Sequence, residues 1–412
     1  MKVNADAAGL DEGRLERIAE YLRRCYVDRG LLPGCQVAVS RGGQIGFFRS
    51  LGMMDIERGR PVDETTIWRI FSMTKPVTAV AALMLYERGD LQLDDQVSKF
   101  LPELAGLKVR EQGTDGKERL VDPERPVTVW DLLTHMGGFG FPGGRSPKMW
   151  ALANRRPGSG FVLSYLRQGA TLGTLIENLA DQPLEFHPGT RWMYTISTDV
   201  CARVVEVVTG QSFDAYLQEA IFGPLGMVDT GFRVPDGKLD RFGPIYRRDV
   251  GHTLAVLEDP ERSPFRDEQT FLSGGGGLLS TTADYIRFSD VLANGGVSRG
   301  VRILGRKTIE LMGSNHIPAG GDLRSVAVPG NYGEIEFDGM GFGLSVAVGI
   351  DPTRMRSVGS VGEMTWGGAA STTFWADPSE SLSVVFMTQF LPSKGNSLRR
   401  ELKALVYAAL AD

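Results

Sequence analysis

The sequence predicts an α+β protein in which strands from both ends of the chain form one antiparallel sheet flanked by helices. Strand-like runs lie within residues 35–52 and again after residue 343, whereas residues 91–270 carry helical patterns, loops and prolines with few such runs. We therefore expect an α/β part made of residues 1–90 and 271–412 and a mostly helical part made of residues 91–270. The active site would lie in the cleft between the two parts.

The N-terminal elements follow from local patterns. A charged amphipathic helix begins near residue 12, and two β-rich runs, CQVAVSR and QIGFFRSLG, are separated by Gly42-Gly43, which predicts a hairpin with a glycine turn. Residues 72–88 place apolar side chains at helical spacing and are followed by Gly89, a residue typical of the position just after a helix. This pattern predicts a buried helix that starts at Ser72.

The C-terminal part of the chain returns to strand-like patterns. Three apolar runs rich in Val, Phe and Thr predict strands, and an amphipathic helix is expected to end the chain. The runs are GLSVAVGI, STTFWAD and LSVVFMTQ, and the helical segment is LRRELKALVYAAL.

Composition excludes several classes of function. The 412 residues include 50 acidic and 45 basic side chains, and the basic ones are scattered, which argues against nucleic-acid binding. Three cysteines without C-x-x-C spacing favour a reducing compartment, and the four histidines form no H-x-x-x-H or H-x-H pair, so no metal or other cofactor is expected. With no apolar run of secretory or membrane-spanning length, we expect a soluble, cytoplasmic protein. The oligomeric state stays open.

The motif F-S-M-T-K-P places Ser72 and Lys75 three positions apart at the start of the expected buried helix. Residues at this spacing share a helix face, so the lysine amine can approach the serine hydroxyl. Serine is a weak nucleophile until a neighbour removes its proton, which a lysine can do when burial disfavours its charged form. Alternatively, Ser72 only caps the helix.

Further segments form a recognisable set with this pair. They are V-T-V-W-D-L-L-T-H-M-G-G-F, F-H-P-G-T-R-W-M-Y-T, S-G-G-G-G-L-L-S-T-T-A-D-Y-I-R-F and G-M-G-F-G-L, in that order. From about residue 12 to the C-terminus the chain resembles the serine β-lactamase and penicillin-binding-protein superfamily. Within it, the chain is most similar to the family VIII carboxylesterases, which resemble class C β-lactamases. The resemblance implies that fold and a serine acyl-enzyme mechanism.

The resemblance assigns Tyr194 as the catalytic tyrosine, which would share a proton with Ser72 and Lys75. Which of Lys75 and Tyr194 is the formal base stays open, because coupled groups titrate as a unit. Lactamases carry Y-x-N at this place, whereas Ile196 stands here where they have the amide. This departure weakens a lactamase interpretation.

Trp366-Gly367-Gly368 takes the place of the Lys-Thr-Gly or His-Thr-Gly motif of penicillin-recognising enzymes. Tryptophan offers an apolar wall and one N–H donor, which suits a neutral ester, and it lacks the cation that binds a β-lactam carboxylate. The backbone N–H groups of Ser72 and Ala369 would form the oxyanion hole. We therefore expect Trp366, Gly367, Gly368 and Ile196 to line the substrate site.

The expected activity is a serine carboxylesterase that hydrolyses short to medium acyl esters of small molecules. A β-lactamase, a D-amino-acid peptidase and an acyltransferase of the same fold remain alternatives, as does a binding protein that has lost catalysis. The glycine-rich and aromatic segment from Gly137 to about Ala180 either covers the acyl pocket or is an ordinary connecting loop.

Three other signals receive structural interpretations. Gly296 to Gly300 matches G-x-S-x-G, but a helical pattern precedes it where a nucleophile elbow needs a strand, so Ser298 is expected in a surface turn. His135 and His187 are expected to be buried and hydrogen-bonded. Residues 274–277, all glycine, are expected to form a close-packed backbone that leads into a helix, where Thr281 and Asp284 have the spacing of a capping box.

Overall fold

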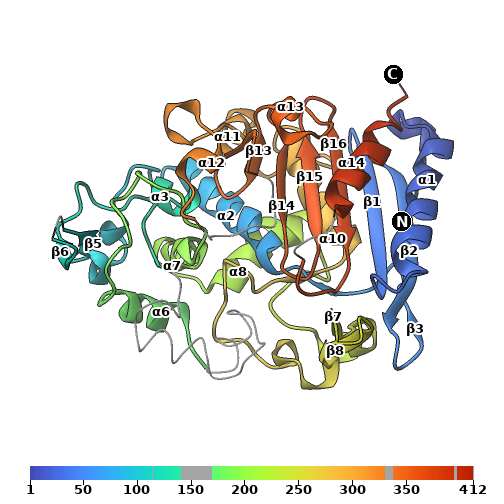
Figure 1. Ribbon diagram of the computed structural model, residues 1–412, viewed down its shortest axis with the longest axis horizontal. Helices are drawn as coiled ribbons and strands as arrows, with labels where there is room; N and C mark the ends of the chain where they lie inside the picture. Colours follow the sequence, from blue (N-terminus) through green and yellow to red (C-terminus); the bar gives the residue numbers. More distant parts are fainter. Residues whose placement is uncertain (114, 141–168, 330–336, 394–396, 412) are drawn as a thin grey trace.

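The computed structural model describes residues 1–113, 115–140, 169–329, 337–393 and 397–411 (Figure 1). Its main feature is an eight-stranded antiparallel sheet in the order β12-β13-β14-β15-β16-β1-β2-β3. The bounds are β1 Gly34–Arg41, β2 Gln44–Asp55, β3 Arg60–Pro61, β12 Met340–Phe342, β13 Ala347–Gly349, β14 Met364–Gly367, β15 Thr373–Asp377 and β16 Leu382–Met387.

The two ends of the chain meet in the middle of this sheet, as the sequence predicts. β16 pairs with β1, and Ala38 stands opposite Val385. The expected glycine turn joins β1 to β2, because Gly42 and Gly43 have φ values of 57° and 77°. Those values match a type I′ turn, whose twist suits a two-residue hairpin.

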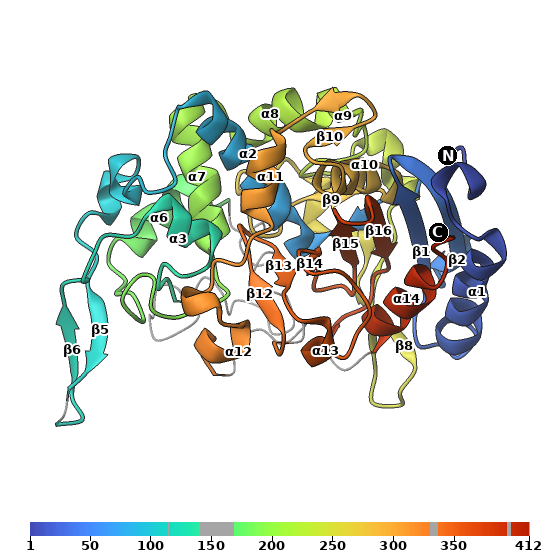
Figure 2. The same ribbon diagram turned by 90° about the horizontal axis from the view of Figure 1, so that it is seen from above.

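Helices cover both faces of the sheet (Figure 1, Figure 2). α1 and α14 pack on one face, where their apolar side chains meet those of β1, β15 and β16, including Val37 and Val384. α2 and α10 lie on the opposite face with Ala38 and Val385. Neighbouring residues therefore point to opposite faces, as the period of two in a strand requires. The helices are α1 Glu12–Leu22, α2 Thr74–Arg88, α3 Val129–Leu133, α6 Leu172–Leu179, α7 Ser197–Thr209, α8 Phe213–Leu217, α9 Gly223–Leu225, α10 Thr282–Ala293, α11 Arg306–Met312, α12 Leu323–Val326, α13 Pro352–Met355 and α14 Leu398–Tyr407.

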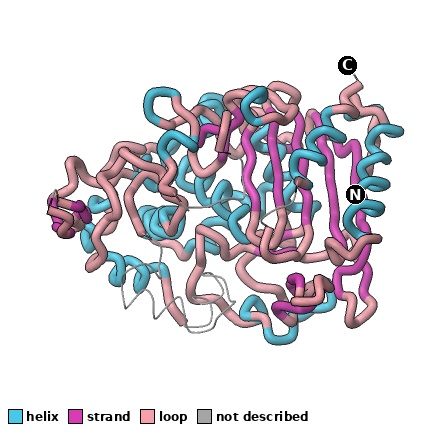
Figure 3. The backbone as a smooth tube through the Cα atoms, in the orientation of Figure 1, coloured by secondary structure: helices cyan, strands magenta, loops and turns pink. Residues whose placement is uncertain are grey.

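The region expected to be mostly helical also contains two β-hairpins (Figure 3). One, β5–β6, lies at the end of the molecule away from the sheet. The other, β7–β8, contacts the end of β16, because the Tyr246 N–H donates to the Gln389 carbonyl at 2.9 Å and the Leu391 N–H donates to the Tyr246 carbonyl at 2.8 Å. The division of the chain into two parts and the cleft between them stay predictions. The small strands are β4 Trp68–Arg69, β5 Val109–Gln112, β6 Glu118–Val121, β7 Ile245–Arg248, β8 Leu254–Glu258, β9 Leu279–Ser280, β10 Val297–Ser298 and β11 Val301–Arg302.

The predicted buried helix is α2, which ends at Gly89 with φ of 79°. Its α-helical part begins at Thr74, two residues later than expected, because Phe71 to Met73 form a 3₁₀ turn. Among the described residues, no helix is both long and apolar enough to cross a membrane.

Asp290 on α10 is an acidic side chain buried against the sheet, so its ionisation should affect the stability of the fold. Its side chain is fully buried, Ser40 donates to one carboxylate oxygen at 3.1 Å, and the other oxygen finds no donor in the described chain. Burial raises the pKa of Asp290 to about 6. Because this value lies above that of the unfolded chain, about 3.9, ionisation destabilises the fold as the pH rises through this window.

We expect Asp290→Asn to stabilise the fold by roughly 2 kcal/mol at about pH 8 and by much less at about pH 4. Thermal unfolding at both pH values measures this difference. Glu20→Gln, an exposed position on α1, is the control and should change little at either pH. A variant no more stable than the wild type at the higher pH would contradict the prediction.

Candidate active site

The N-terminus of α2 is held in place by hydrogen bonds to segments far away in the sequence. The Tyr285 hydroxyl donates to the Met73 carbonyl at 2.8 Å, and the Thr74 hydroxyl accepts from the Leu278 N–H at 3.2 Å. One turn further, Thr78 donates to the Gly274 carbonyl at 2.7 Å. All these groups are buried, so their hydrogen bonds strongly favour one position of the helix start.

The chain enters this helix through a constrained backbone. Phe71 has φ of 42°, in the left-handed region that costs a residue with a side chain about 1 kcal/mol or more. Two residues earlier, Arg69 is fully buried, forms an ion pair with Glu258 at 2.9 Å and lies 3.7 Å from the centre of the Phe242 ring. These contacts anchor β4 and hold Ser72 at the turn that follows it.

Ser72, Lys75 and Tyr194 come together as the sequence predicts they should. The Tyr194 hydroxyl donates to Ser72 Oγ at 2.5 Å, and Lys75 Nζ lies 3.3 Å from the same oxygen. Lys75 Nζ also lies 4.4 Å from the centre of the Tyr194 ring. Ser72 does not cap α2, because the N-cap position is Met73. The hydroxyl is therefore available to two proton-exchanging groups.

Lys75 is buried, with 4% of its surface exposed, and its amine donates to the Gly275 carbonyl at 2.6 Å. Behind that carbonyl lies the buried carboxylate of Asp199, which accepts from the Gly275 N–H at 3.1 Å and from Ser273 Oγ at 2.6 Å. Burial raises the pKa of Asp199, against the opposing effects of the Ser273 hydrogen bond and the Lys75 charge. These hydrogen bonds of Asp199 fix the position of Gly275, whose carbonyl accepts from Lys75.

Sequence reasoning missed Asp199 and the role of Gly275. A Cβ on Gly275 would lie 2.6 Å from Asp199 Oδ2, so only glycine fits beside this carboxylate. The available signal was an acidic residue among apolar ones at the start of the helix that follows Tyr194. The close packing expected of the glycine run is confirmed.

His135 lies beside this group, with its ring centre 5.1 Å from that of Tyr194. It is buried as expected, but the predicted hydrogen bonds are wrong, since neither ring nitrogen has a partner in the described chain. Burial lowers the pKa of His135 well below its usual value, and the nearby Lys75 lowers it further. His187, by contrast, is half-buried and bonded through both nitrogens, to Glu124 N at 3.1 Å and Glu111 Oε1 at 2.7 Å.

Trp366 is fully buried at the end of β14, and its ring centre lies 5.3 Å from that of Tyr194. Ile196 is also buried, at the N-cap position of α7. Trp366 thus packs directly against the Tyr194 ring. The roles of Trp366 and Ile196 in substrate binding stay predictions. β14 itself was not expected as a strand, and it places the Trp-Gly-Gly motif at a strand end.

The glycines of this motif allow β14 to approach the start of α2. A Cβ on Gly368 would lie 2.4 Å from the Ile70 carbonyl oxygen and 2.3 Å from Thr372 Oγ1. The next residue, Ala369, has an N–H group for which the described chain offers no acceptor. An N–H in this state is suited to an oxyanion, and its assignment to the oxyanion hole stays a prediction.

The G-x-S-x-G segment forms a β-hairpin in which β10 pairs with β11, so it is no nucleophile elbow. Ser298 is buried, and the turn consists of Arg299 and Gly300, so the expected surface position of the serine is wrong. At the start of α10, Thr281 accepts from the Asp284 N–H at 3.1 Å, which is one half of the predicted capping box. The other half is not formed, because Asp284 Oδ2 accepts from the Asp229 N–H at 2.7 Å and from Thr230 Oγ1 at 3.1 Å.

Part of the segment that was expected to cover the acyl pocket, residues 141–168, lies outside the described residues. Its described continuation includes α6, which is preceded by the N-cap residue Thr171 in a capping box. In the described parts of the chain, no three histidine, cysteine, aspartate or glutamate side chains cluster in a way that would hold a metal ion.

A helix-covered antiparallel sheet with Ser72 and Lys75 at a buried helix start defines a serine hydrolase of the β-lactamase and penicillin-binding-protein fold. The family model described as Beta-lactamase matches residues 20–408, and the chain belongs to this family. It is 32% identical over 410 residues to Esterase EstB of Burkholderia gladioli, an alignment that covers 93% of this chain and 91% of that protein.

Solved structures agree with this assignment. The structure described as "EstCE1, a hydrolase with promiscuous acyltransferase activity" matches with a TM-score of 0.76 and 25% identity, over 97% of this chain and 99% of that one. A family VIII carboxylesterase matches with a TM-score of 0.72 and 18% identity, over 99% of both chains, and shares the fold. The resemblance predicted from the sequence motifs is confirmed.

Gly368→Ala tests the close approach of β14 to Ile70. Gly368 has no left-handed φ, so the added methyl acts by displacing the strand end from Ser72. We expect kcat/KM for ester hydrolysis to fall at least about tenfold, since small displacements of reacting groups are costly. Gly106→Ala, where a Cβ meets nothing within 4 Å, is the control. Equal activity of both variants would contradict the steric argument.

Proposed function

We propose that this protein is a carboxylesterase that hydrolyses short to medium acyl esters of small molecules through an acyl-enzyme on Ser72. The observation that carries the proposal is the position of Ser72 Oγ, 2.5 Å from the Tyr194 hydroxyl and 3.3 Å from Lys75 Nζ. Both distances allow proton transfer to or from the serine. The similarity to Esterase EstB supports the same reaction class.

In the acylation step, Ser72 Oγ attacks the ester carbonyl carbon while its proton passes to the Lys75 and Tyr194 pair. The carbonyl oxygen becomes an oxyanion, which the N–H groups of Ser72 and Ala369 would stabilise. Collapse of the tetrahedral intermediate breaks the bond to the alkoxy oxygen, and the pair returns the proton to the departing alcohol. The product of this step is an ester of Ser72.

In the deacylation step, water attacks the acyl carbon and gives a proton to the same pair. The acid leaves as Ser72 regains its proton, so all atoms and charges balance. The position of the Lys75 amine, 3.3 Å from Ser72 Oγ, suits proton exchange in both steps.

Two side chains favour an ester over a β-lactam. Trp366 stands where lactamases carry a cation, and Ile196 stands where they carry an amide, so the site offers a lactam neither that positive charge nor that amide. Acyl transfer to an alcohol remains the second candidate, because EstCE1 is described as a hydrolase with that additional activity. The cytoplasmic location expected from the sequence is part of the same proposal.

Ser72→Ala should abolish hydrolysis of p-nitrophenyl butyrate, whereas Ser298→Ala should retain nearly all of it, because Ser298 has no proton-accepting partner in the described chain. Initial rates measure both effects. The wild type should hydrolyse nitrocefin far more slowly than the ester. Retained activity in Ser72→Ala would overturn the assignment of the nucleophile, and rapid nitrocefin turnover would favour a lactamase.

Lys75→Ala and Tyr194→Phe should each lower kcat by roughly a hundredfold or more, and the double variant should be little worse than the worse single one. Residues that move one proton as a unit lose their function together. Stopped-flow measurement of acylation in all four forms tests this expectation. Effects that simply multiply would show that the lysine and the tyrosine act independently.

A further inference from the structure

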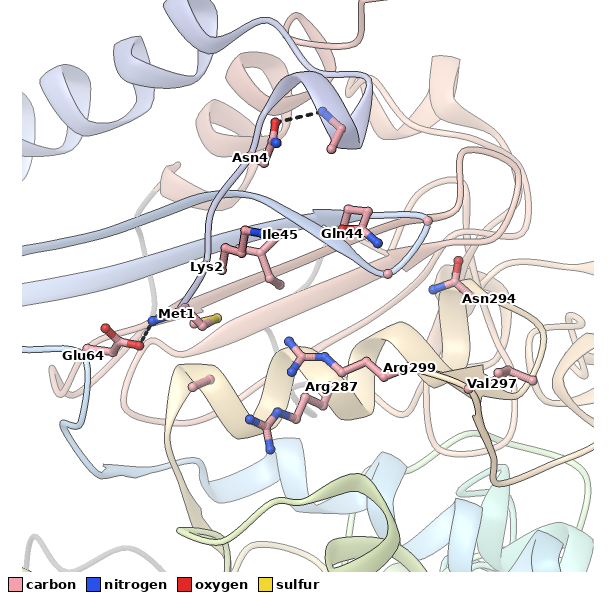
Figure 4. A pocket seen from close by; sticks show the side chains of 15 residues that line it. Met1, Lys2, Asn4, Gln44, Ile45, Glu64, Arg287, Asn294, Val297 and Arg299 are labelled. Atoms are coloured by element: carbon pink, nitrogen blue, oxygen red, sulfur yellow. Dashed lines mark hydrogen bonds and ion pairs between the residues drawn. The ribbon is translucent and has the colours of Figure 1, made fainter.

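A cavity of about 1030 Å³ lies between the N-terminal segment, the β1–β2 turn, α10 and the β10–β11 hairpin (Figure 4). Gly42 and Gly43, which line the cavity, follow the C-terminal end of β1. Gly34 lies at the other end of this strand, on the side of the sheet where the strand ends are near Ser72. The cavity therefore lies away from Ser72. None of the candidate active-site residues lines it. The cavity therefore calls for an explanation separate from ester hydrolysis.

Three basic side chains line this cavity: Lys2, Arg287 and Arg299. Figure 4 shows the guanidinium groups of Arg287 and Arg299 on the same wall, below Met1 and Ile45. No carboxylate of the described chain forms an ion pair with any of the three. Glu64 is the acidic residue among those lining the cavity, and its carboxylate contacts the amino nitrogen of Met1.

The two arginines are positioned by their own elements. Nη1 of Arg287 donates to the carbonyls of Leu225 and Gly226, which end α9, while its buried Nε meets no acceptor in the described chain. Arg299 occupies the first position of the two-residue hairpin turn with φ of 49°, a conformation usually taken by glycine or asparagine. Burial and the neighbouring Arg287 both lower the pKa of Arg299, and the nearby Asp290 raises it, so the two arginines repel each other close to one buried acidic residue.

We propose that this cavity binds a small organic molecule that carries a phosphate monoester, with the phosphate between Arg287 and Arg299. Guanidinium groups bind phosphate oxygens in a bidentate manner, and a dianion would remove the repulsion between the two arginines. Lys2 adds a third positive charge. The apolar side chains of Ile45 and Val297 would contact the organic part of the ligand.

The volume supports an organic ligand over a free ion. Small-molecule sites commonly measure about 300 to 1,000 Å³, and this cavity lies at the upper end of that range. Inorganic phosphate alone would fill a small part of it and would leave the apolar lining uncovered. A phosphate-bearing molecule uses both the charges and the volume.

Isothermal titration calorimetry with phenyl phosphate at constant ionic strength tests the proposal, with inorganic phosphate as a second probe. We expect saturable binding of phenyl phosphate, tighter than that of inorganic phosphate, that weakens at least about tenfold in Arg299→Gln. Arg302→Gln is the matched control, because Arg302 is an exposed arginine on β11 that does not line the cavity. Its affinity should stay within about twofold of the wild type.

Arg287→Gln should weaken binding as well, and Arg299→Gln keeps the test valid if the loss of the α9 contact unfolds that variant. Unchanged unfolding temperatures show that the compared variants are folded. Absence of saturable phenyl phosphate binding would overturn the proposal, as would equal weakening by Arg302→Gln. Vesicles that contain phosphatidic acid provide the last arm, and binding to vesicles without binding to phenyl phosphate would identify a lipid headgroup and overturn the small-molecule site.

Discussion

The burial of the Lys75 amine is the constraint on which the rest of the site depends. An amine without contact to bulk water needs acceptors close by, and the Gly275 carbonyl at 2.6 Å supplies one. The Asp199 carboxylate holds the same residue by its N–H, and this carboxylate lies so close to Gly275 that no side chain fits there. Burial of one amine thus determines the packing of the glycine run and of α7 around it.

The site draws on four segments that are far apart in the sequence. Ser72 and Lys75 come from the start of α2, Tyr194 precedes α7, the glycine run precedes α10, and Trp366 ends β14. Each is fixed by contacts to another, as when Tyr194 lies between the Lys75 amine and the Trp366 ring. The geometry around Ser72 is therefore a property of the folded chain as a whole, in which the ion pair of Arg69 and Glu258 anchors the entry to α2.

Much of the fold and the central residues could be predicted because they produce local patterns. The Gly42-Gly43 hairpin and the helix after Ser72 follow from periodicity and turn chemistry. The F-S-M-T-K-P motif predicted Ser72 and Lys75, and the family resemblance implied Tyr194. β14 escaped because it has only four residues, of which the last is a glycine, and a second glycine follows it; glycine carries no β preference. The β7–β8 hairpin, and with it the contact of Tyr246 with β16, escaped because its residues resemble the surrounding loops.

Features that depend on burial could not be predicted, because a sequence does not reveal which polar group lacks a partner. His135 and Asp199 illustrate this point, since burial lowers the pKa of the histidine and raises that of the aspartate. Both pKa shifts disfavour the charged form of a side chain that lies near Lys75. A low-polarity setting strengthens the response of the oxyanion to nearby N–H groups. The same burial that holds the lysine in place therefore also increases the effect of every dipole directed at the serine.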